Sequence, residues 1–157
     1  MRITLYKTVL DAEMRTPCLV KENAVNYGGG VAYNNATDVA IMLNSVFNHG
    51  LETEELVYLL CFDIKRHLIG VFNVSHGTDC LSAMNPREIL MKALLCGAHY
   101  IIVAHNHPSG DTTPSNSDIS STQRLKEACG LVGIGLTDSI VLSDKTVYSM
   151  KGNGDLA

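Results

Sequence analysis

The order of apolar and polar positions along the chain predicts strands that alternate with helices. Short apolar runs typical of strands occur at residues 3–10, 56–62, 67–75, 101–104, 133–136, 139–142 and 146–150. Apolar residues at helical spacing occur at 37–48, 86–96 and 115–130. The run at 56–62 is apolar throughout, which favours a strand covered on both faces. This order predicts an α/β sandwich with a sheet of mixed strand direction.

The expected helices have recognisable start and stop residues. Thr37 is the expected N-cap of the first helix, and Gly50 its expected stop. The second helix begins at Asn85 as N-cap with Pro86 in the first position. Glu88 stands three residues after Asn85, where its side chain can close a capping box.

Residues 1–36 form a separate N-terminal extension of uncertain structure, and residues 37–157 form the predicted domain. The Gly28–Gly30 run lacks the spacing of phosphate-binding glycine loops, so we interpret it as a hinge or surface loop. Cleft loops are expected at 27–33 and 79–85. The extension itself suggests no function.

Composition narrows the class of protein. The chain has 157 residues, 46% hydrophobic and 18% charged, which predicts one compact domain with a real core. Its net charge is −4, and its basic residues cluster only in pairs, at Lys65-Arg66 and Arg124-x-Lys126. This charge balance gives little support to strong nonspecific DNA binding. Folding could still bring basic residues together into a surface patch. Because no segment reads as a signal peptide or a membrane span, we expect a cytoplasmic protein without membrane contact.

The candidate chemistry lies in residues 105–118, HNHPSGDTTPSNSD. His105 and His107 stand at alternate positions of an expected strand, so their imidazoles point to one face from Cα atoms about 7 Å apart. Asp118 returns after a Pro/Gly loop and offers a carboxylate. Three N/O ligands with a fourth position left to water are typical of a catalytic metal site. Asp118 also fits a helix cap together with Ser115, and the spacing leaves both interpretations open.

A general base is expected among the three glutamates Glu52, Glu54 and Glu55, which precede the buried strand. Glu55 is nearest the apolar run. Of two other chemistries, a zinc deaminase is rejected and a cysteine–histidine hydrolase is a weak hypothesis. The deaminase signature of H-x-E with P-C-x-x-C is absent from the sequence. Cys80 is the one cysteine placed as a candidate nucleophile, but no histidine stands beside it.

The motif His105-x-His107-Pro108, with Ser115 and Asp118 eight and eleven positions after His107, resembles the JAMM (MPN+) signature of JAB-domain metalloproteases. The sequence around this motif, over roughly residues 37–150, is similar to the RadC branch of that family. The resemblance implies a cytidine-deaminase-like three-layer α/β/α fold that binds one Zn²⁺.

Carried over by position, the resemblance makes His105, His107 and Asp118 the zinc ligands, Glu55 the base and Ser115 an oxyanion-stabilising hydroxyl. The family's usual histidine after Asp138 is replaced here by Ser139.

The resemblance implies hydrolysis of a peptide or isopeptide bond in a peptide or protein substrate. The alternative is a module of the RadC type that is associated with DNA or DNA repair and lacks significant peptidase activity. The sequence names no substrate, and it leaves open whether the chain acts as a homodimer.

Overall fold

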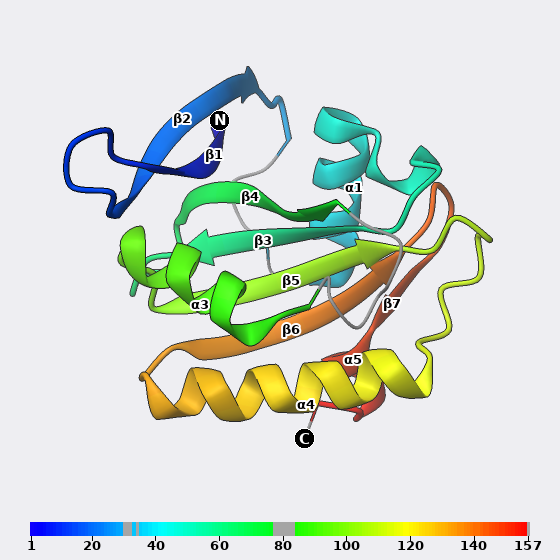
Figure 1. Ribbon diagram of the computed structural model, residues 1–157. Helices are drawn as coiled ribbons and strands as arrows, with labels where there is room; N and C mark the ends of the chain where they lie inside the picture. Colours follow the sequence, from blue (N-terminus) through cyan, green and yellow to red (C-terminus); the bar gives the residue numbers. More distant parts are fainter. Residues whose placement is uncertain (30–32, 34, 77–83, 157) are drawn as a thin grey trace.

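The computed structural model describes residues 1–29, 33, 35–76 and 84–156 (Figure 1). Its centre is a seven-stranded sheet in the order β2-β1-β4-β3-β5-β6-β7. The strands are β1 (Arg2–Leu10), β2 (Pro17–Asn26), β3 (Leu56–Phe62), β4 (Leu68–His76), β5 (Tyr100–Asn106), β6 (Gly135–Leu142) and β7 (Val147–Ser149). The pairs β1/β4 and β5/β6 are parallel, and the other neighbours are antiparallel. The prediction of an α/β fold with a mixed sheet is confirmed.

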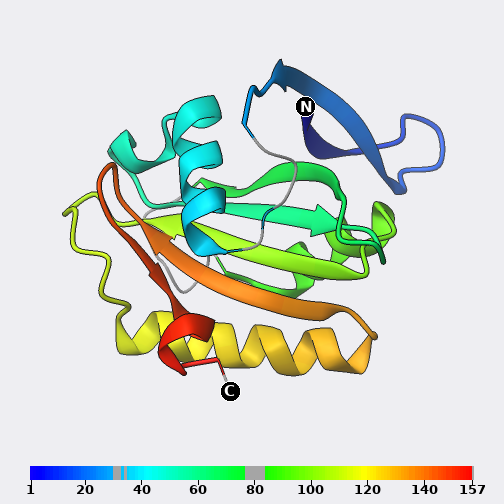
Figure 2. The same ribbon diagram turned by 180° about the vertical axis from the view of Figure 1, so that it is seen from behind.

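Helices cover both faces of this sheet. Helix α1 (Ala36–Phe47) lies on one face, whereas α3 (Pro86–Leu95) and α4 (Asn116–Leu131) lie on the other, as the two opposite views show (Figures 1 and 2). A 3₁₀ turn, η1 (His49–Leu51), follows α1, and a short α5 (Met150–Asn153) follows β7. The buried side chains accordingly form two apolar clusters, one on each side of the sheet.

Strand β3 lies in the middle of the sheet, between β4 and β5. All seven of its residues are buried, because β4 and β5 flank it and helices cover both its faces. The continuous apolar run at 56–62 therefore predicted its environment correctly. The two strands expected at 133–136 and 139–142 are instead the single strand β6. The polar residue between them, Asp138, is accommodated because its carboxylate accepts hydrogen bonds from the Ser149 hydroxyl and from two backbone N–H groups.

Both ends of α1 differ from the prediction. Asn35, rather than Thr37, is the N-cap, and its side chain accepts a 2.9 Å hydrogen bond from the Asp38 N–H. At the other end Asn48 takes the left-handed conformation at φ 53°, which asparagine tolerates better than most residues. Gly50 serves a different purpose, because a Cβ there would overlap the backbone of Ser143.

The structure also differs from the sequence prediction at the start of α3 and in the N-terminal extension. The Asn85 side chain does cap α3, but the Glu88 carboxylate pairs with Arg87 and Lys92 instead of closing a capping box. Residues of the expected extension form the β1–β2 hairpin, and β1 adds to the sheet by parallel pairing with β4. Ile3 of this hairpin is 1% exposed and belongs to the core.

Candidate metal centre

Strand β5 delivers the first ligand and the turn after it delivers the second. His105 is the penultimate residue of β5, and the His107 N–H continues the ladder by donating to the Leu142 carbonyl at 3.2 Å. The chain then turns through Pro108, and the Gly110 N–H donates to the His107 carbonyl at 2.9 Å. Gly110 has a φ of 81°, a conformation that side chains disfavour. This turn ends the strand and sends the chain towards the N-terminus of α4.

The three predicted ligands meet at one point. The two Nε2 atoms of His105 and His107 are 3.3 Å apart, and each lies 3.5 Å from one oxygen of Asp118. Around a tetrahedral ion with bonds of about 2.0–2.1 Å, ligand atoms are about 3.3–3.4 Å apart. The two imidazole nitrogens are at this spacing, and one ligand atom from each of the three residues lies within 4.8 Å of the others, so the group could hold one metal ion after a small shift of the carboxylate.

The Asp118 carboxylate divides its two oxygens between two tasks. Its Oδ2 accepts hydrogen bonds from the Ser115 N–H at 2.8 Å and from the Ser115 hydroxyl at 2.7 Å. The Ser115 oxygen in turn accepts the Asp118 N–H at 3.2 Å, which completes a capping box at the start of α4. Oδ1, 3.5 Å from His105, has no such bond within the described residues and is free to bind a cation. Helix cap and metal ligand are thus compatible roles for Asp118.

The neighbouring charges shift the pKa values of these groups in the metal-free protein. Burial alone raises the pKa of the Asp118 carboxyl, but hydrogen bonds from His105 and His107 outweigh it and hold that pKa well below its usual range. The Asp118 carboxylate raises the pKa of His107 above its ordinary value, against the opposing effect of burial. The Asp111 carbonyl and the charge of Glu55 act in the same direction as Asp118. The Asp118 carboxylate therefore stays charged beside the two imidazoles.

Hydrogen bonding also fixes the orientation of the second histidine. The His107 Nδ1 lies 2.7 Å from the Asp111 carbonyl, which only accepts, so this nitrogen carries the proton and leaves the Nε2 lone pair for a metal. The side chains of His105, Asp118 and His107 are 4%, 5% and 13% exposed. Solvent therefore reaches the site from the His107 side, where a fourth ligand position would lie.

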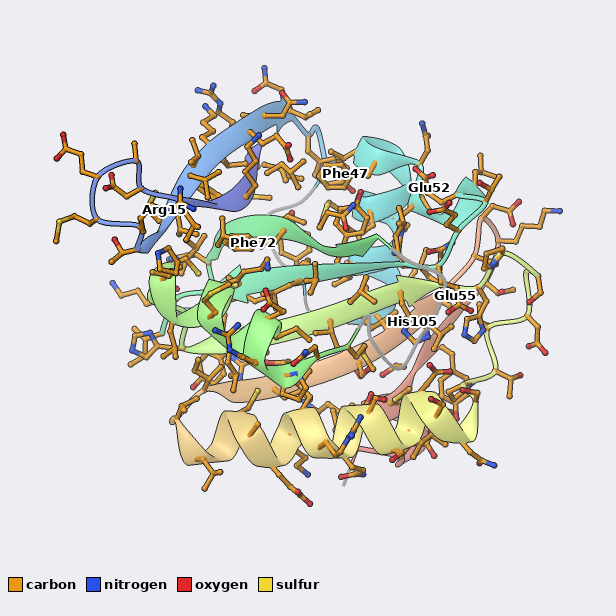
Figure 3. All side chains as sticks on the ribbon, in the orientation of Figure 1. Arg15, Phe47, Glu52, Glu55, Phe72 and His105 are labelled. Carbon is orange, nitrogen blue, oxygen red and sulfur yellow. The ribbon has the colours of Figure 1, made fainter. Side chains whose placement is uncertain are left out.

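Glu55 stands beside this opening. In the antiparallel β3/β5 register Val57 pairs with His105, which places Glu55 across from His107. Figure 3 shows Glu55 at the same end of the sheet as His105, and Glu52 farther away. Of the three glutamates considered from the sequence, Glu54 is exposed and Glu52 lines a neighbouring cavity. Glu55 is therefore the one of the three glutamates that the strand register places across from His107, and its charge acts on that histidine.

Asn106 was not singled out from the sequence, yet it holds the segment that carries Glu55. Its fully buried side chain accepts the Leu56 N–H at 2.8 Å and donates to the carbonyls of Glu54 at 3.0 Å and Glu52 at 3.4 Å. These bonds flank Glu55 on both sides. The only sequence signal was a polar side chain between two histidines, pointing to the opposite face of a buried strand.

The two serines of the motif have defined contacts. Ser115 directs its single hydroxyl proton at Asp118, so donation to an oxyanion requires that hydroxyl to rotate. Ser139, at the position where the resemblance implies a histidine, is buried and lies 2.9 Å from the Thr122 hydroxyl of α4. It therefore joins β6 to the helix that supplies Asp118.

A cavity of about 690 Å³ opens next to the histidine turn. Its walls are residues 50–53, 108–110 and 143–146, from η1, the His107 turn and the β6–β7 turn. Of the loops expected to line a cleft, residues 30–32 and 77–83 lie outside the described part of the chain, and so does Cys80.

Comparison with known proteins agrees with this geometry. A family model described as "RadC-like JAB domain" matches residues 33–155. The chain belongs to the RadC-like JAB domain family. Its predicted relationship is thereby confirmed, and the family match begins close to the boundary expected between the extension and the domain.

Curated relatives of this RadC-like JAB domain carry the name UPF0758 protein. The chain is 38% identical to the one from Thermotoga maritima over 102 residues, which are 65% of this chain and 46% of that protein. It is 44% identical to the one from Actinobacillus pleuropneumoniae serotype 5b over 107 residues, 67% of this chain and 49% of the relative. The chain thus matches about half the length of these relatives. Within the described residues, no helix is both long and apolar enough to cross a membrane.

Proposed function

We propose that this RadC-like JAB domain is a zinc-dependent hydrolase that cleaves a peptide or isopeptide bond. The observation that carries the proposal is the convergence of two imidazole nitrogens and the Asp118 carboxylate within 4.8 Å of one another, with Glu55 across from His107 in the strand register. Two nitrogen ligands and one oxygen ligand suit Zn²⁺, and three protein ligands leave a position for water.

The residues have distinct roles in this proposal. His105, His107 and Asp118 would hold a zinc ion, which would supply Lewis acidity. Glu55 would take a proton from the attacking water and pass it to the leaving nitrogen. Ser115, after rotating its hydroxyl away from Asp118, donates to the oxygen on which negative charge develops. Asn106 keeps the backbone on either side of Glu55 in place throughout.

The substrate class follows from the neighbouring cavity. An opening of about 690 Å³ continuous with the His107 turn is large enough for several residues of an extended chain. Its lining includes the polar side chains of Glu52, Thr53 and Ser109, which can form hydrogen bonds to a peptide. A polypeptide segment is therefore the substrate that we propose.

A cleavage screen tests the proposal. The zinc-loaded wild-type protein and its Glu55→Gln variant are incubated with a library of peptides from a bacterial proteome, and new termini are identified by mass spectrometry. The proposal predicts cleavages by the wild type that fall at least about 100-fold in Glu55→Gln, because general-base catalysis contributes about that much. No difference between the two proteins contradicts it.

One observation favours a second candidate, a DNA-associated module without significant peptidase activity. Ser115 and Asp118 already have a structural role as a capping box, which needs no catalysis. That candidate predicts an inactive protein in the screen and DNA binding that weakens steeply with salt. Cleavage without such binding excludes it.

A further inference from the structure

A second cavity, remote from the metal centre, is bordered by three cationic side chains. It measures about 210 Å³, and Arg66, Tyr100, Lys126, Gly135, Leu136, Thr137, Lys151 and Leu156 line it. Tyr100 is the first residue of β5 and His105 lies near its end, so this cavity is about 17 Å from the metal ligands by strand rise. The cations come from the β3–β4 turn, α4 and α5, which are separate in sequence.

The Arg66 guanidinium is held in position before any ligand arrives. Arg66 has a φ of 62°, in a turn that the Asp63 carboxylate closes by accepting the N–H groups of Lys65 and His67. Its guanidinium carbon lies 4.1 Å from the centre of the Tyr100 ring, and Nη1 donates to the Thr137 hydroxyl at 3.4 Å. A cation–π contact and a hydrogen bond thus reduce the entropy lost when Arg66 binds an anion.

Among the described residues, no carboxylate lines this cavity and none forms a salt bridge with Arg66, Lys126 or Lys151. Two acidic side chains nearby in sequence already have partners. Asp138 accepts from a serine hydroxyl and two backbone N–H groups, and Asp155 accepts from a tyrosine hydroxyl. In a chain of net charge −4, three cations without a salt bridge among the described residues border one small cavity and make its lining cationic, although Asp138 and Asp155 keep their charges nearby.

We infer that this cavity binds a phosphate group, free or as a monoester. A phosphate monoester carries a charge of about −1.5 to −2 at pH 7 and three acceptor oxygens, which three cationic side chains match. At about 30 Å³ per water the cavity has room for about seven waters, enough for a phosphate and the first atoms of its ester group. The inference is independent of the proposed hydrolase activity, because none of the lining residues belongs to the metal centre.

Isothermal titration calorimetry at constant ionic strength tests this site. The probes are phenyl phosphate, inorganic phosphate and phenyl sulfate, which has the shape of phenyl phosphate with a single charge. We expect saturable one-to-one binding of phosphate probes, and phenyl sulfate binding weaker by about tenfold. Tighter binding of phenyl phosphate than of inorganic phosphate identifies an ester ligand, and the reverse order identifies free phosphate.

Variants locate the binding. Lys126→Met and Lys151→Met should each weaken phosphate binding about tenfold, the loss of one charge-assisted hydrogen bond. Arg124→Met is the matched control, because Arg124 is an exposed cation of the same helix that does not line the cavity. His107→Ala should bind phosphate as the wild type does, which separates this site from binding at the metal. Equal affinities in Lys126→Met and Arg124→Met, loss of binding in His107→Ala, or no saturable binding would each overturn the inference.

Discussion

Replacing Asn106 by alanine tests how the fold couples the ligand strand to the segment that carries Glu55. The change removes one acceptor and two donors without altering any proposed metal ligand. The Leu56 N–H belongs to a residue that is 7% exposed, so losing its 2.8 Å partner leaves a buried donor at a cost of about 1–3 kcal/mol. The 3.0 Å bond to the Glu54 carbonyl adds about 1 kcal/mol, and the 3.4 Å bond to Glu52 adds little.

The expected loss in the free energy of unfolding is therefore about 2–4 kcal/mol. Urea unfolding of the metal-free protein measures it, and with a slope of about 2 kcal/mol/M the midpoint should fall by about 1–2 M. Asn44→Ala is the matched control. The Asn44 side chain also joins two segments, through the Gly50 N–H at 2.7 Å and the Ser143 carbonyl at 3.0 Å, but it does not touch residues 54–56.

Activity separates positioning from stability. On a peptide found in the cleavage screen, Asn106→Ala should lower kcat by about 100-fold, as a misplaced base does, and retain its zinc. Asn44→Ala should lose comparable stability and keep most of its kcat, with any effect confined to KM because its partners Gly50 and Ser143 line the proposed substrate cavity. If both variants lose kcat equally, or if Asn106→Ala unfolds at the wild-type urea concentration, the assigned role of Asn106 is wrong.

Three further predictions concern His49, Ser115 and His107. His49 is fully buried and burial lowers its pKa to about 3 from 6.5, so it stays neutral in the folded protein while the unfolded chain takes up a proton below pH 6.5. The unfolding free energy should therefore drop by about 2 kcal/mol between pH 6.5 and 5, and His49→Phe should flatten this slope. Ser115→Ala should cost about 1 kcal/mol of stability by calorimetry and Ser115→Thr far less, whereas equal losses would contradict the cap. The raised pKa of His107 means that protons compete with metal, so zinc affinity by competition titration should rise as pH increases through that pKa; a flat profile would refute it.

The parts of the fold that were predictable are those where one local pattern determines the outcome. The apolar run at 56–62 has no polar face, so it had to be a covered strand, and β3 is one. His105 and His107 share a face because strands alternate, which placed both on the site. The N-terminal end of α1 was missed because Asn35 and Thr37 are both good N-caps in isolation. Which of them caps the helix depends on the backbone conformation that the tertiary fold imposes there.

The remaining features depend on contacts between distant segments, which leave no periodic signal. Asp118 could not be assigned as cap or ligand from its position, since the answer lies in which oxygen each partner uses. Asn106 bonds to backbone groups about fifty positions earlier, and backbone groups carry no sequence signature. The basic residues looked too sparse for a site until the fold brought Arg66, Lys126 and Lys151 around one cavity.

Metal content is the most direct measure of the central claim, that His105, His107 and Asp118 bind one metal ion. The wild type, His107→Ala and His99→Ala are purified without added metal, and their metal content is measured by elemental mass spectrometry. His99 is an exposed histidine outside the site and serves as the control. We predict about one zinc per chain in the wild type and in His99→Ala, as a single three-ligand site requires, and almost none in a folded His107→Ala. Equal zinc in all three proteins would contradict the claim.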